Sequence, residues 1–157
     1  MRKLTKTPSS HRNPLWHMYR FIKFGKILKN TVVIEACRYL PSVRLKRTLF
    51  IKLLGMKIGE ETAIAFKAVP DIMYPELIAI GKRSVIGYNA TILTHEFLVD
   101  EFRKGNVQIG DYTLIGANVT ILPGVTIGNY AKVGAGTVVT KNVPDHALAY
   151  GNPMQLK

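Results

Sequence analysis

Branched aliphatic residues recur at every sixth position through much of the second half of the chain. They form two blocks, first Ile80, Ile86 and Ile92, and then Ile109, Ile115, Ile121, Ile127, Val133 and Val139. An α-helix repeats about every 3.6 residues and a strand every 2.0, so neither regular element accounts for the pattern. A period of six predicts short strands separated by corners, with one aliphatic side chain pointing inward in each segment.

Two further columns keep the same register. Glycine directly follows six of the aliphatics, and a small or β-branched residue comes four positions after most of them, at Ser84, Ala90, Thr113, Val119, Val125, Ala131, Thr137 and Val143. Leu93, Leu122 and Thr140 replace the glycine at every third repeat, so three repeats, or eighteen residues, make one turn. The sequence therefore predicts a three-sided coil whose turns pair as parallel strands about 4.8 Å apart.

The corners of such a coil need residues that tolerate a positive φ. Glycine and asparagine do so more readily than other residues, and Asn89, Asn118 and Asn129 fall near the expected corners. The period does not set the hand of the coil, because parallel crossover connections are normally right-handed.

The repeats are interrupted twice. A weaker register at Ile58 and Ile64 is lost through residues 66–79, which predicts an irregular first coil. Between the two regular blocks the spacing is 17 residues instead of 6, so about 11 extra residues leave the coil as a protruding loop, 94–106. Polar excursions from a regular scaffold commonly carry function. We assign residues 58–157 to the coil and this loop.

Residues 1–57 form a basic first third. They contain 14 Lys and Arg against one acid, Glu35, whereas residues 58–157 contain 8 against 9. Solvated helix faces would explain this charge; alternatively, residues 15–57 dock on anionic lipid or hold an anionic acceptor. Nucleic acid is not an expected partner, because no recognition motif accompanies the charge.

The pattern of residues 15–40 mixes aromatic and aliphatic residues with basic ones at a spacing of three, which predicts an amphipathic helix. Pro41 and Ser42 predict a break and an N-cap, followed by a second helix that runs to Gly55. Its expected inward residues are Val43, Leu45, Leu49, Phe50 and Leu53, and its expected outward residues are Arg44, Lys46, Arg47 and Lys52. We expect both helices to cap the open end of the coil.

Sorting signals are weak in this sequence. The basic start is followed by polar residues, without the apolar segment or the Ala-x-Ala site of a secretory signal. No apolar run approaches the roughly 18 residues of a transmembrane helix. The single cysteine, Cys37, cannot form an internal disulfide. We therefore expect a cytoplasmic protein, with peripheral contact at the inner membrane surface as the alternative.

The repeats resemble those of the hexapeptide-repeat acyltransferases, in the branch of the maltose, galactoside and xenobiotic O-acetyltransferases. The most specific blocks are residues 109–128 and 133–144, and the closing Gly151-Asn-Pro153 is similar to the Gly-x-Pro ending of that family. The basic first third looks closer to a subgroup of acetyltransferases of undefined substrate. The resemblance implies an all-β solenoid, a left-handed parallel β-helix with an N-terminal α-helical cap, assembled as a homotrimer.

The same resemblance implies that His95, on the protruding loop, is the catalytic base. Transfer of an acetyl group to a hydroxyl needs a base for the acceptor proton, and imidazole is suited to that role near neutral pH. A carboxylate should hold the second ring nitrogen, and Asp71, Glu76 and Glu96 are all candidates. The family's zinc enzymes need three converging histidines, whereas His95 is the one histidine that we place within the repeats, so no metal is expected.

Acetyl-CoA is the acyl donor that the resemblance implies, with its pantetheine arm along the outside of the coils. The positions that match the donor site are Gly116, Ala117, Ala135, Thr140 and Lys141, the lysine lying at the phosphate end. The expected acceptor is small, sugar-like and attacked at a hydroxyl, with an amine as the weaker alternative. A non-catalytic scaffold or CoA-binding regulator is the competing function, and the histidine loop argues against it.

Overall fold

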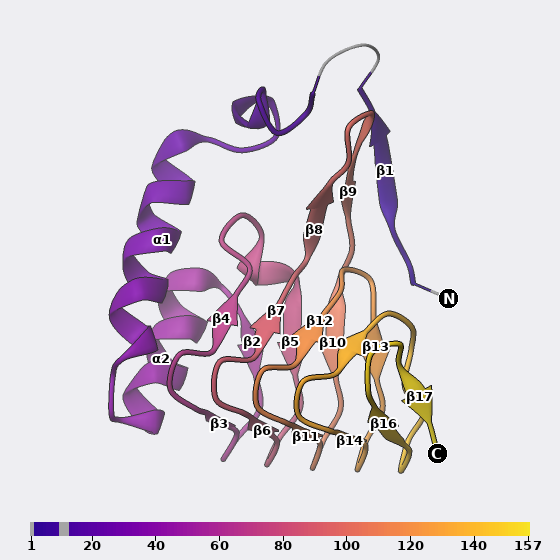
Figure 1. Cartoon of the computed structure of the whole chain (residues 1–157). Helices are drawn as coiled ribbons and strands as arrows, with labels where there is room; N and C mark the ends of the chain where they lie inside the picture. Colours follow the sequence, from indigo (N-terminus) through magenta and orange to yellow (C-terminus); the bar gives the residue numbers. More distant parts are fainter. Residues whose placement is uncertain (1, 10–12) are drawn as a thin grey trace.

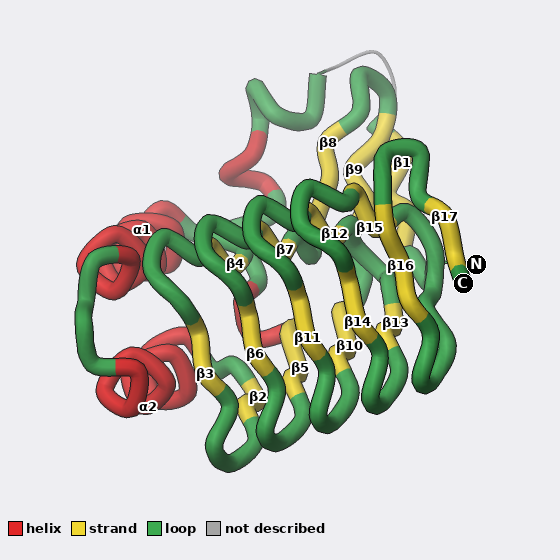
Figure 2. Tube along the Cα trace, turned by 60° about the horizontal axis from the view of Figure 1, so that its bottom comes forward, coloured by secondary structure: helices red, strands yellow, loops and turns green. Residues whose placement is uncertain are grey.

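The computed structural model describes residues 2–9 and 13–157 (Figure 1). From Lys57 onward the chain winds through three sheets in turn, which we call the first, second and third faces (Figure 2). The first face contains β2 (Lys57–Ile58), β5 (Ile78–Ile80), β10 (Val107–Ile109) and β13 (Thr126–Ile127). The second contains β3 (Ala63–Ile64), β6 (Val85–Ile86), β11 (Leu114–Ile115), β14 (Lys132–Val133), β16 (Leu148–Tyr150) and β17 (Gln155–Leu156). The third contains β4 (Val69–Pro70), β7 (Thr91–Ile92), β12 (Thr120–Ile121) and β15 (Val138–Val139).

Successive coils pair in parallel and in the predicted register; the exception is β17, which runs antiparallel to β16. Ile80 aligns with Ile109, and Ile109 with Ile127, so the six-residue aliphatics stack in columns along the interior. These aliphatics are buried, as is the column of small residues four positions later. Thr113, in that second column, donates its hydroxyl to the carbonyl oxygen of Gly128 at 2.8 Å. The three-sided arrangement expected from the period is therefore confirmed.

The repeated glycines serve close packing between coils rather than positive φ. A Cβ placed on Gly110 would lie 2.6 Å from the backbone nitrogen of Asn129 in the next coil, so no side chain fits there. Positive φ belongs instead to other corner residues, such as Asn89 at 54° and Asn118 at 56°. The prediction is confirmed for Asn89 and Asn118 but wrong for Asn129, because the positive φ at that corner belongs to Tyr130, at 56°. It is also wrong for the repeated glycines, whose place is set by the close approach of neighbouring coils.

The first coil is more regular than the sequence indicated. Pro70 occupies the inward position after Ile64 and pairs in register with Ile92, so the six-residue spacing continues through β4. The irregular stretch is shorter than the predicted 66–79 and is confined to the residues after Pro70, including the short 3₁₀ helix η2 (Pro75–Leu77). Proline was not recognised as an inward residue because it is not a branched aliphatic.

Two α-helices, α1 (Phe24–Arg38) and α2 (Val43–Leu54), pack against the first coil at one end (Figures 1 and 2). The Ser42 hydroxyl accepts a hydrogen bond from the backbone N–H of Leu45, which confirms the N-cap. The first helix begins at Phe24 and not near residue 15, and only the 3₁₀ turn η1 (Met18–Arg20) precedes it. No helix in the described part of the chain is long and apolar enough to cross a membrane.

The inward face of α2 differs from the predicted one. Lys46, Phe50 and Leu54, spaced four residues apart, are buried, whereas three of the predicted inward residues, Val43, Leu45 and Leu53, are exposed. The ammonium group of Lys46 donates to the carbonyl oxygen of Ala65 at 3.0 Å. Burial lowers the pKa of Lys46, and the nearby Cys37 opposes that shift. Lys46 was predicted to point outward because a charge was taken to exclude burial, whereas its long apolar stem packs inward.

The loop 94–106 leaves the coil as a hairpin of β8 (His95–Phe97) and β9 (Glu101–Lys104). A third strand, β1 (Thr5–Pro8), pairs antiparallel with β9, so the start of the chain lies against the hairpin (Figure 1). This strand was not predicted, because residues 5–8 show no alternation of apolar and polar residues. The hairpin therefore belongs to a small three-stranded sheet beside the coil.

Candidate active site

Asp71 and His95 meet because their coils are stacked. Asp71 directly follows β4, and Thr94 and His95 follow β7, its neighbour in the third face. The two strands pair in register, Pro70 opposite Ile92, so their chain exits lie side by side at one corner. Side chains 24 residues apart in the sequence are thereby brought into contact.

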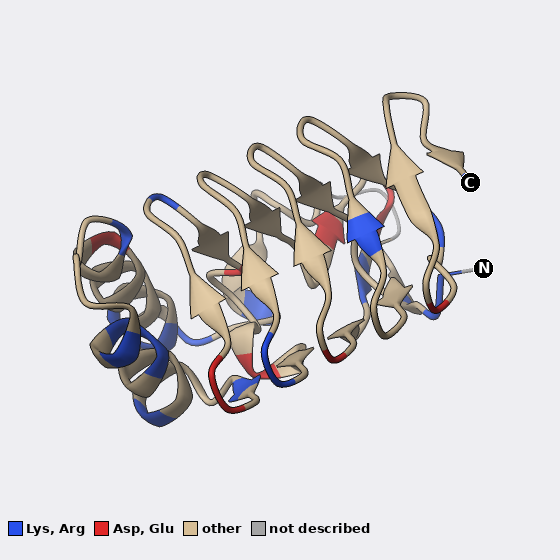
Figure 3. Cartoon of the chain, turned by 90° about the horizontal axis from the view of Figure 1, so that it is seen from below, with Lys and Arg blue, Asp and Glu red and all other residues tan. Residues whose placement is uncertain are grey.

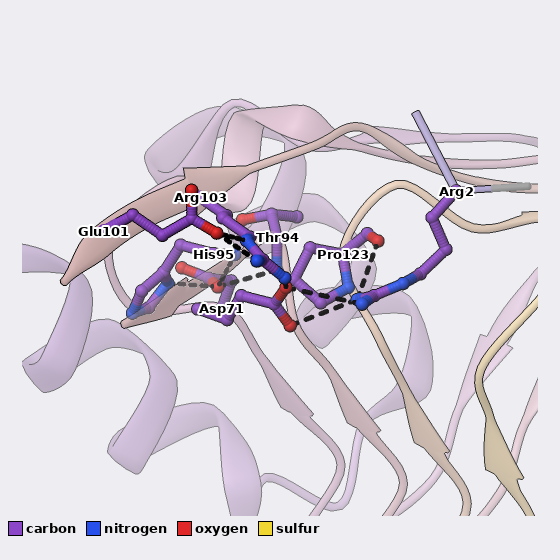
Figure 4. A network of polar contacts seen from close by, with 8 residues as sticks. Arg2, Asp71, Thr94, His95, Glu101, Arg103 and Pro123 are labelled. Carbon is purple, nitrogen blue, oxygen red and sulfur yellow. Dashed lines mark hydrogen bonds and ion pairs between the residues drawn. The ribbon is translucent and has the colours of Figure 1, made fainter. Parts of the chain in front are cut away.

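Five hydrogen bonds converge on the carboxylate of Asp71, whose side chain is fully buried; those from Thr94 and His95 are drawn in Figure 4. One oxygen, Oδ1, accepts from the backbone N–H groups of Met73 at 2.8 Å and Tyr74 at 2.9 Å. The other, Oδ2, accepts from the backbone N–H groups of Thr94 at 2.8 Å and His95 at 3.1 Å, and lies 2.6 Å from His95 Nδ1. The carboxylate is thus held from both sides of the corner.

The environment of Asp71 favours its charged form. Burial raises the pKa of this carboxyl, but the hydrogen bond and charge of His95, with the N–H donors of Tyr74 and Thr94, outweigh burial and lower the pKa below the ordinary value. An ionised Asp71 can only accept hydrogen bonds, so His95 Nδ1 must carry the proton. In a neutral ring, Nε2 is then the nitrogen with a free lone pair. No residue in the described ranges hydrogen-bonds Nε2, which leaves it free to act as a base.

Aromatic rings surround the imidazole of His95. The Phe97 ring meets it edge-on with centroids 5.4 Å apart, and the Tyr74 ring does so at 6.3 Å. Phe102 lies 6.2 Å away and is itself stacked on Phe21 at 4.4 Å. These rings were not predicted as part of the site, although the spacing of His95, Phe97 and Phe102 on two paired strands is typical of residues that share one face.

The other two candidate carboxylates do not contact His95. Glu96 points to the opposite side of β8, as strand alternation requires, and pairs with Arg2 at 3.1 Å and Arg103 at 3.4 Å. Glu76 pairs with Lys26 at 2.7 Å. Of the three candidates, the structure brings only Asp71 onto the imidazole. Within the described residues, no three His, Cys, Asp or Glu side chains converge as a metal site would need.

Removal of the Glu76 charge tests whether Asp71, and not Glu76, is the carboxylate that orients His95. Glu76→Gln keeps the size of the side chain and leaves the Asp71–His95 contact untouched, so we expect kcat to stay within about twofold of the wild-type value. Steady-state assays of the variant beside the wild type measure it. A loss as large as that of an Asp71 variant would instead make Glu76 part of the catalytic site.

Comparisons with known proteins place the chain in a family. The family model described as bacterial transferase hexapeptide (six repeats) matches residues 106–141. "Putative acetyltransferase YvoF" of Bacillus subtilis is 51% identical over 156 residues, which cover 99% of this chain and 91% of the relative. "Putative acetyltransferase SAS0727" of Staphylococcus aureus is 58% identical over 157 residues, covering 100% and 98%. The chain belongs to the hexapeptide-repeat acetyltransferases.

Solved hexapeptide-repeat structures share this fold. A hexapeptide-repeat acetyltransferase from Vibrio cholerae, complexed with acetyl coenzyme A, has a TM-score of 0.71 at 23% identity, covering 84% of this chain and 85% of that one. A maltose O-acetyltransferase from Clostridium difficile has a TM-score of 0.62 at 22% identity, covering 85% of each chain. A galactoside acetyltransferase in complex with coenzyme A has a TM-score of 0.61 at 22% identity, covering 99% and 85%.

The donor-site residues expected of a hexapeptide-repeat acetyltransferase lie at two corners. Gly116 and Ala117 follow β11, and Ala135 follows β14, directly stacked on them: the N–H of Gly136 donates to the carbonyl oxygen of Ala117 at 2.8 Å. Thr140 and Lys141 follow β15, at the corner that His95 leaves two turns earlier and Asp71 three turns earlier. The five residues thus flank the third face. With coils about 4.8 Å apart, Lys141 lies about 10 Å along the coil axis from the His95 exit.

Proposed function

We propose that this protein transfers an acetyl group from acetyl-CoA to a hydroxyl of a small, sugar-like acceptor. His95 acts as the general base, and Asp71 positions it. The observation that carries the proposal is the contact between a buried, ionised Asp71 and His95 Nδ1, which directs the free Nε2 lone pair away from the carboxylate. The solved maltose and galactoside acetyltransferases named above support a sugar-like acceptor and an oxygen nucleophile.

The proposed reaction moves one proton and one acetyl group. His95 Nε2 takes the acceptor hydroxyl proton as the oxygen attacks the thioester carbonyl carbon, which forms a C–O bond and a tetrahedral oxyanion. Collapse of this intermediate breaks the C–S bond, and the protonated Nε2 returns the proton to the CoA thiolate. Asp71 remains ionised throughout and stabilises the imidazolium that forms between the two steps. Transfer is direct in a ternary complex, without a covalent enzyme intermediate.

The donor is proposed to lie along the third face, between the two corners that flank it. The pantetheine arm of acetyl-CoA hydrogen-bonds main-chain groups of Gly116, Ala117 and Ala135. The phosphate groups of acetyl-CoA contact Thr140 and Lys141. Both Thr140 and Lys141 are exposed. Support comes from the placement of all five residues on one side of the coil, continuous with the corner that His95 leaves.

Lys141→Ala should raise the KM for acetyl-CoA by about fivefold to tenfold with kcat unchanged, because one charge-assisted contact to phosphate is lost. The matched control is Lys132→Ala, an exposed lysine on the second face. Initial rates against acetyl-CoA concentration measure both variants. Equal KM values for the two would remove Lys141 from the donor site.

We base the proposed hand of the coil and the proposed oligomeric state on the resemblance to the hexapeptide-repeat acetyltransferases. We propose a left-handed coil, a cap formed by residues 1–57 on a coil formed by residues 58–157, a homotrimer with sites between subunits, and a cytoplasmic location. The helices α1 and α2 at the first coil support the division at residue 57. Sedimentation equilibrium of the purified chain tests the trimer directly.

Calorimetric titration with acetyl-CoA, followed by thiol release with a panel of sugars, other alcohols and amines, tests the proposed activity. Binding and turnover with a hydroxylated acceptor would support it. Turnover with amines alone would contradict transfer to oxygen, and binding without turnover on any acceptor would favour a CoA-binding regulator.

A further inference from the structure

The helical end carries an apolar surface that no described residue covers. Trp16 is 84% exposed, and Tyr19 lies with its ring centroid 5.9 Å from that of Phe24. Phe24, at 60% exposure, begins a row on α1 that continues every four residues through Leu28 and Val32. Residues four apart share one helix face, so the row is continuous. We call Trp16, Tyr19, Phe24, Leu28 and Val32 the cap stripe.

Exposed apolar surfaces of this kind mark interaction sites. Isolated exposed side chains would need no explanation, but here two aromatic residues in the segment before α1 lead directly into an aliphatic row along the helix. The opposite face of α1 is occupied by Ile34 and Cys37, which pack into the core. The helix therefore presents an apolar side to solvent in addition to its buried one.

Cations border the cap stripe, and some of them have no acidic partner. Arg20 and Lys23 stand beside Tyr19 and Phe24 in the sequence, and no carboxylate of the described chain lies within ion-pair distance of either. Lys26, by contrast, is paired with Glu76. Lys and Arg residues are concentrated on the two helices (Figure 3), and residues 16–57 contain 10 of them against one acid, Glu35.

We propose that the cap stripe and its flanking cations dock this protein on an anionic lipid surface. Amphipathic helices with aromatic and aliphatic residues on one face and Lys or Arg beside them bind in the interfacial region of a bilayer. There the apolar side chains enter the boundary of the acyl chains, and the cations contact the headgroups. Anionic lipid headgroups complement the net charge of +9 in residues 16–57, which contain 10 Lys and Arg against one acid, Glu35. A second copy of the cap would bring the same positive charge against this one, which disfavours a dimer through the stripe.

The docking surface is joined to the aromatic wall of the candidate site. Phe21 and Ile22, between Tyr19 and Phe24, turn inward: Phe21 stacks on Phe102, and Ile22 is buried. The Tyr74 hydroxyl donates to the carbonyl oxygen of Phe21 at 2.7 Å. Docking through the cap stripe would therefore hold the His95 hairpin near the lipid surface. The docking itself does not depend on the proposed activity.

Vesicle sedimentation with the full chain tests the proposal. The wild type should bind vesicles of phosphatidylcholine mixed with phosphatidylglycerol at low salt, bind phosphatidylcholine alone much more weakly, and lose binding as salt rises. Trp16→Gln with Leu28→Gln should weaken binding by about tenfold or more. The matched control, Tyr150→Gln with Leu156→Gln, removes an exposed aromatic and an exposed aliphatic residue at the opposite end of the coil (Figure 1) and should bind as the wild type does.

A second pair of double variants tests the contribution of the cations beside the cap stripe to vesicle binding. Arg20→Gln with Lys23→Gln should weaken binding by about tenfold or more, whereas Lys132→Gln with Lys157→Gln should not. Failure of the wild type to bind anionic vesicles, or equal binding by all variants, would overturn the proposal. A change of oligomeric mass in the Trp16 and Leu28 double variant would also overturn it, because the stripe would then be an interface between copies of this chain.

Discussion

Replacement of His95 by alanine should lower kcat by about 10² to 10⁴, because the acceptor hydroxyl loses the group that takes its proton. The KM for acetyl-CoA should change little, since the proposed donor residues at the His95 corner, Thr140 and Lys141, leave the coil two turns away from His95. The fold should persist: Asp71 Oδ2 keeps the backbone N–H groups of Thr94 and residue 95 as donors, so no buried carboxylate is left without partners. Stopped assays of thiol release over a range of pH measure the loss.

His146→Ala is the matched control for this variant. His146 lies at an exposed corner and stacks on Tyr130 with ring centroids 5.0 Å apart, far along the coil from the hairpin. Its removal should leave kcat unchanged, and circular dichroism of both variants should match that of the wild type. Turnover by the His95 variant at the wild-type rate would end the proposal that this histidine is the base.

The fold was largely predictable because its determinants are local and periodic. Each six-residue segment needs one inward aliphatic and one small residue at fixed spacing, so stacked coils repeat the same pattern, as at Ile80, Ile109 and Ile127. The pattern failed to predict burial where a residue other than a branched aliphatic filled an inward position. Pro70 fills an inward position, and Lys46 is buried along its stem with its ammonium on a carbonyl oxygen. Neither residue type indicates burial when taken alone.

The candidate site was predictable in part. His95 stood out because it lies in the one long interruption of a regular pattern, and Asp71 was one of three carboxylates that could orient it. The choice among them depended on the register of Pro70 against Ile92, which places the Asp71 exit beside the His95 exit. Strand β1 could not be predicted, because its pairing with β9 joins segments about 95 residues apart through backbone hydrogen bonds alone.

Replacement of Asp71 by asparagine should lower kcat by about a hundredfold or more through the tautomer of His95. Asparagine has one carbonyl oxygen and one NH₂ group, whereas all five polar contacts of Asp71 are made to a donor. If the NH₂ group occupies the Oδ2 position, Nδ1 must accept, and Nε2 then carries the proton and cannot act as a base. In the other orientation, the NH₂ group opposes the N–H groups of Met73 and Tyr74 at the Oδ1 position.

Both orientations leave donors unsatisfied, so Asp71→Asn should also reduce the free energy of unfolding by about 1–3 kcal/mol near neutral pH. Urea unfolding of the variant and the wild type measures this difference. Glu96→Gln is the control, since Glu96 pairs with Arg2 on the far side of β8 and is half-buried. Its kcat should match the wild type, and its stability should change by less than about 1 kcal/mol.

The stability difference between the wild type and Asp71→Asn should depend on pH in one direction. Because the folded state lowers the pKa of Asp71, ionisation of this group stabilises the folded state at every pH above the ordinary Asp value of about 3.9. That stabilisation is lost as the pH falls through the lower pKa of the folded state, because both states then bind the proton. The two proteins should therefore approach one another in stability at acid pH. A difference that stays constant from neutral to acid pH would show that shape, and not charge, makes Asp71 necessary at this corner.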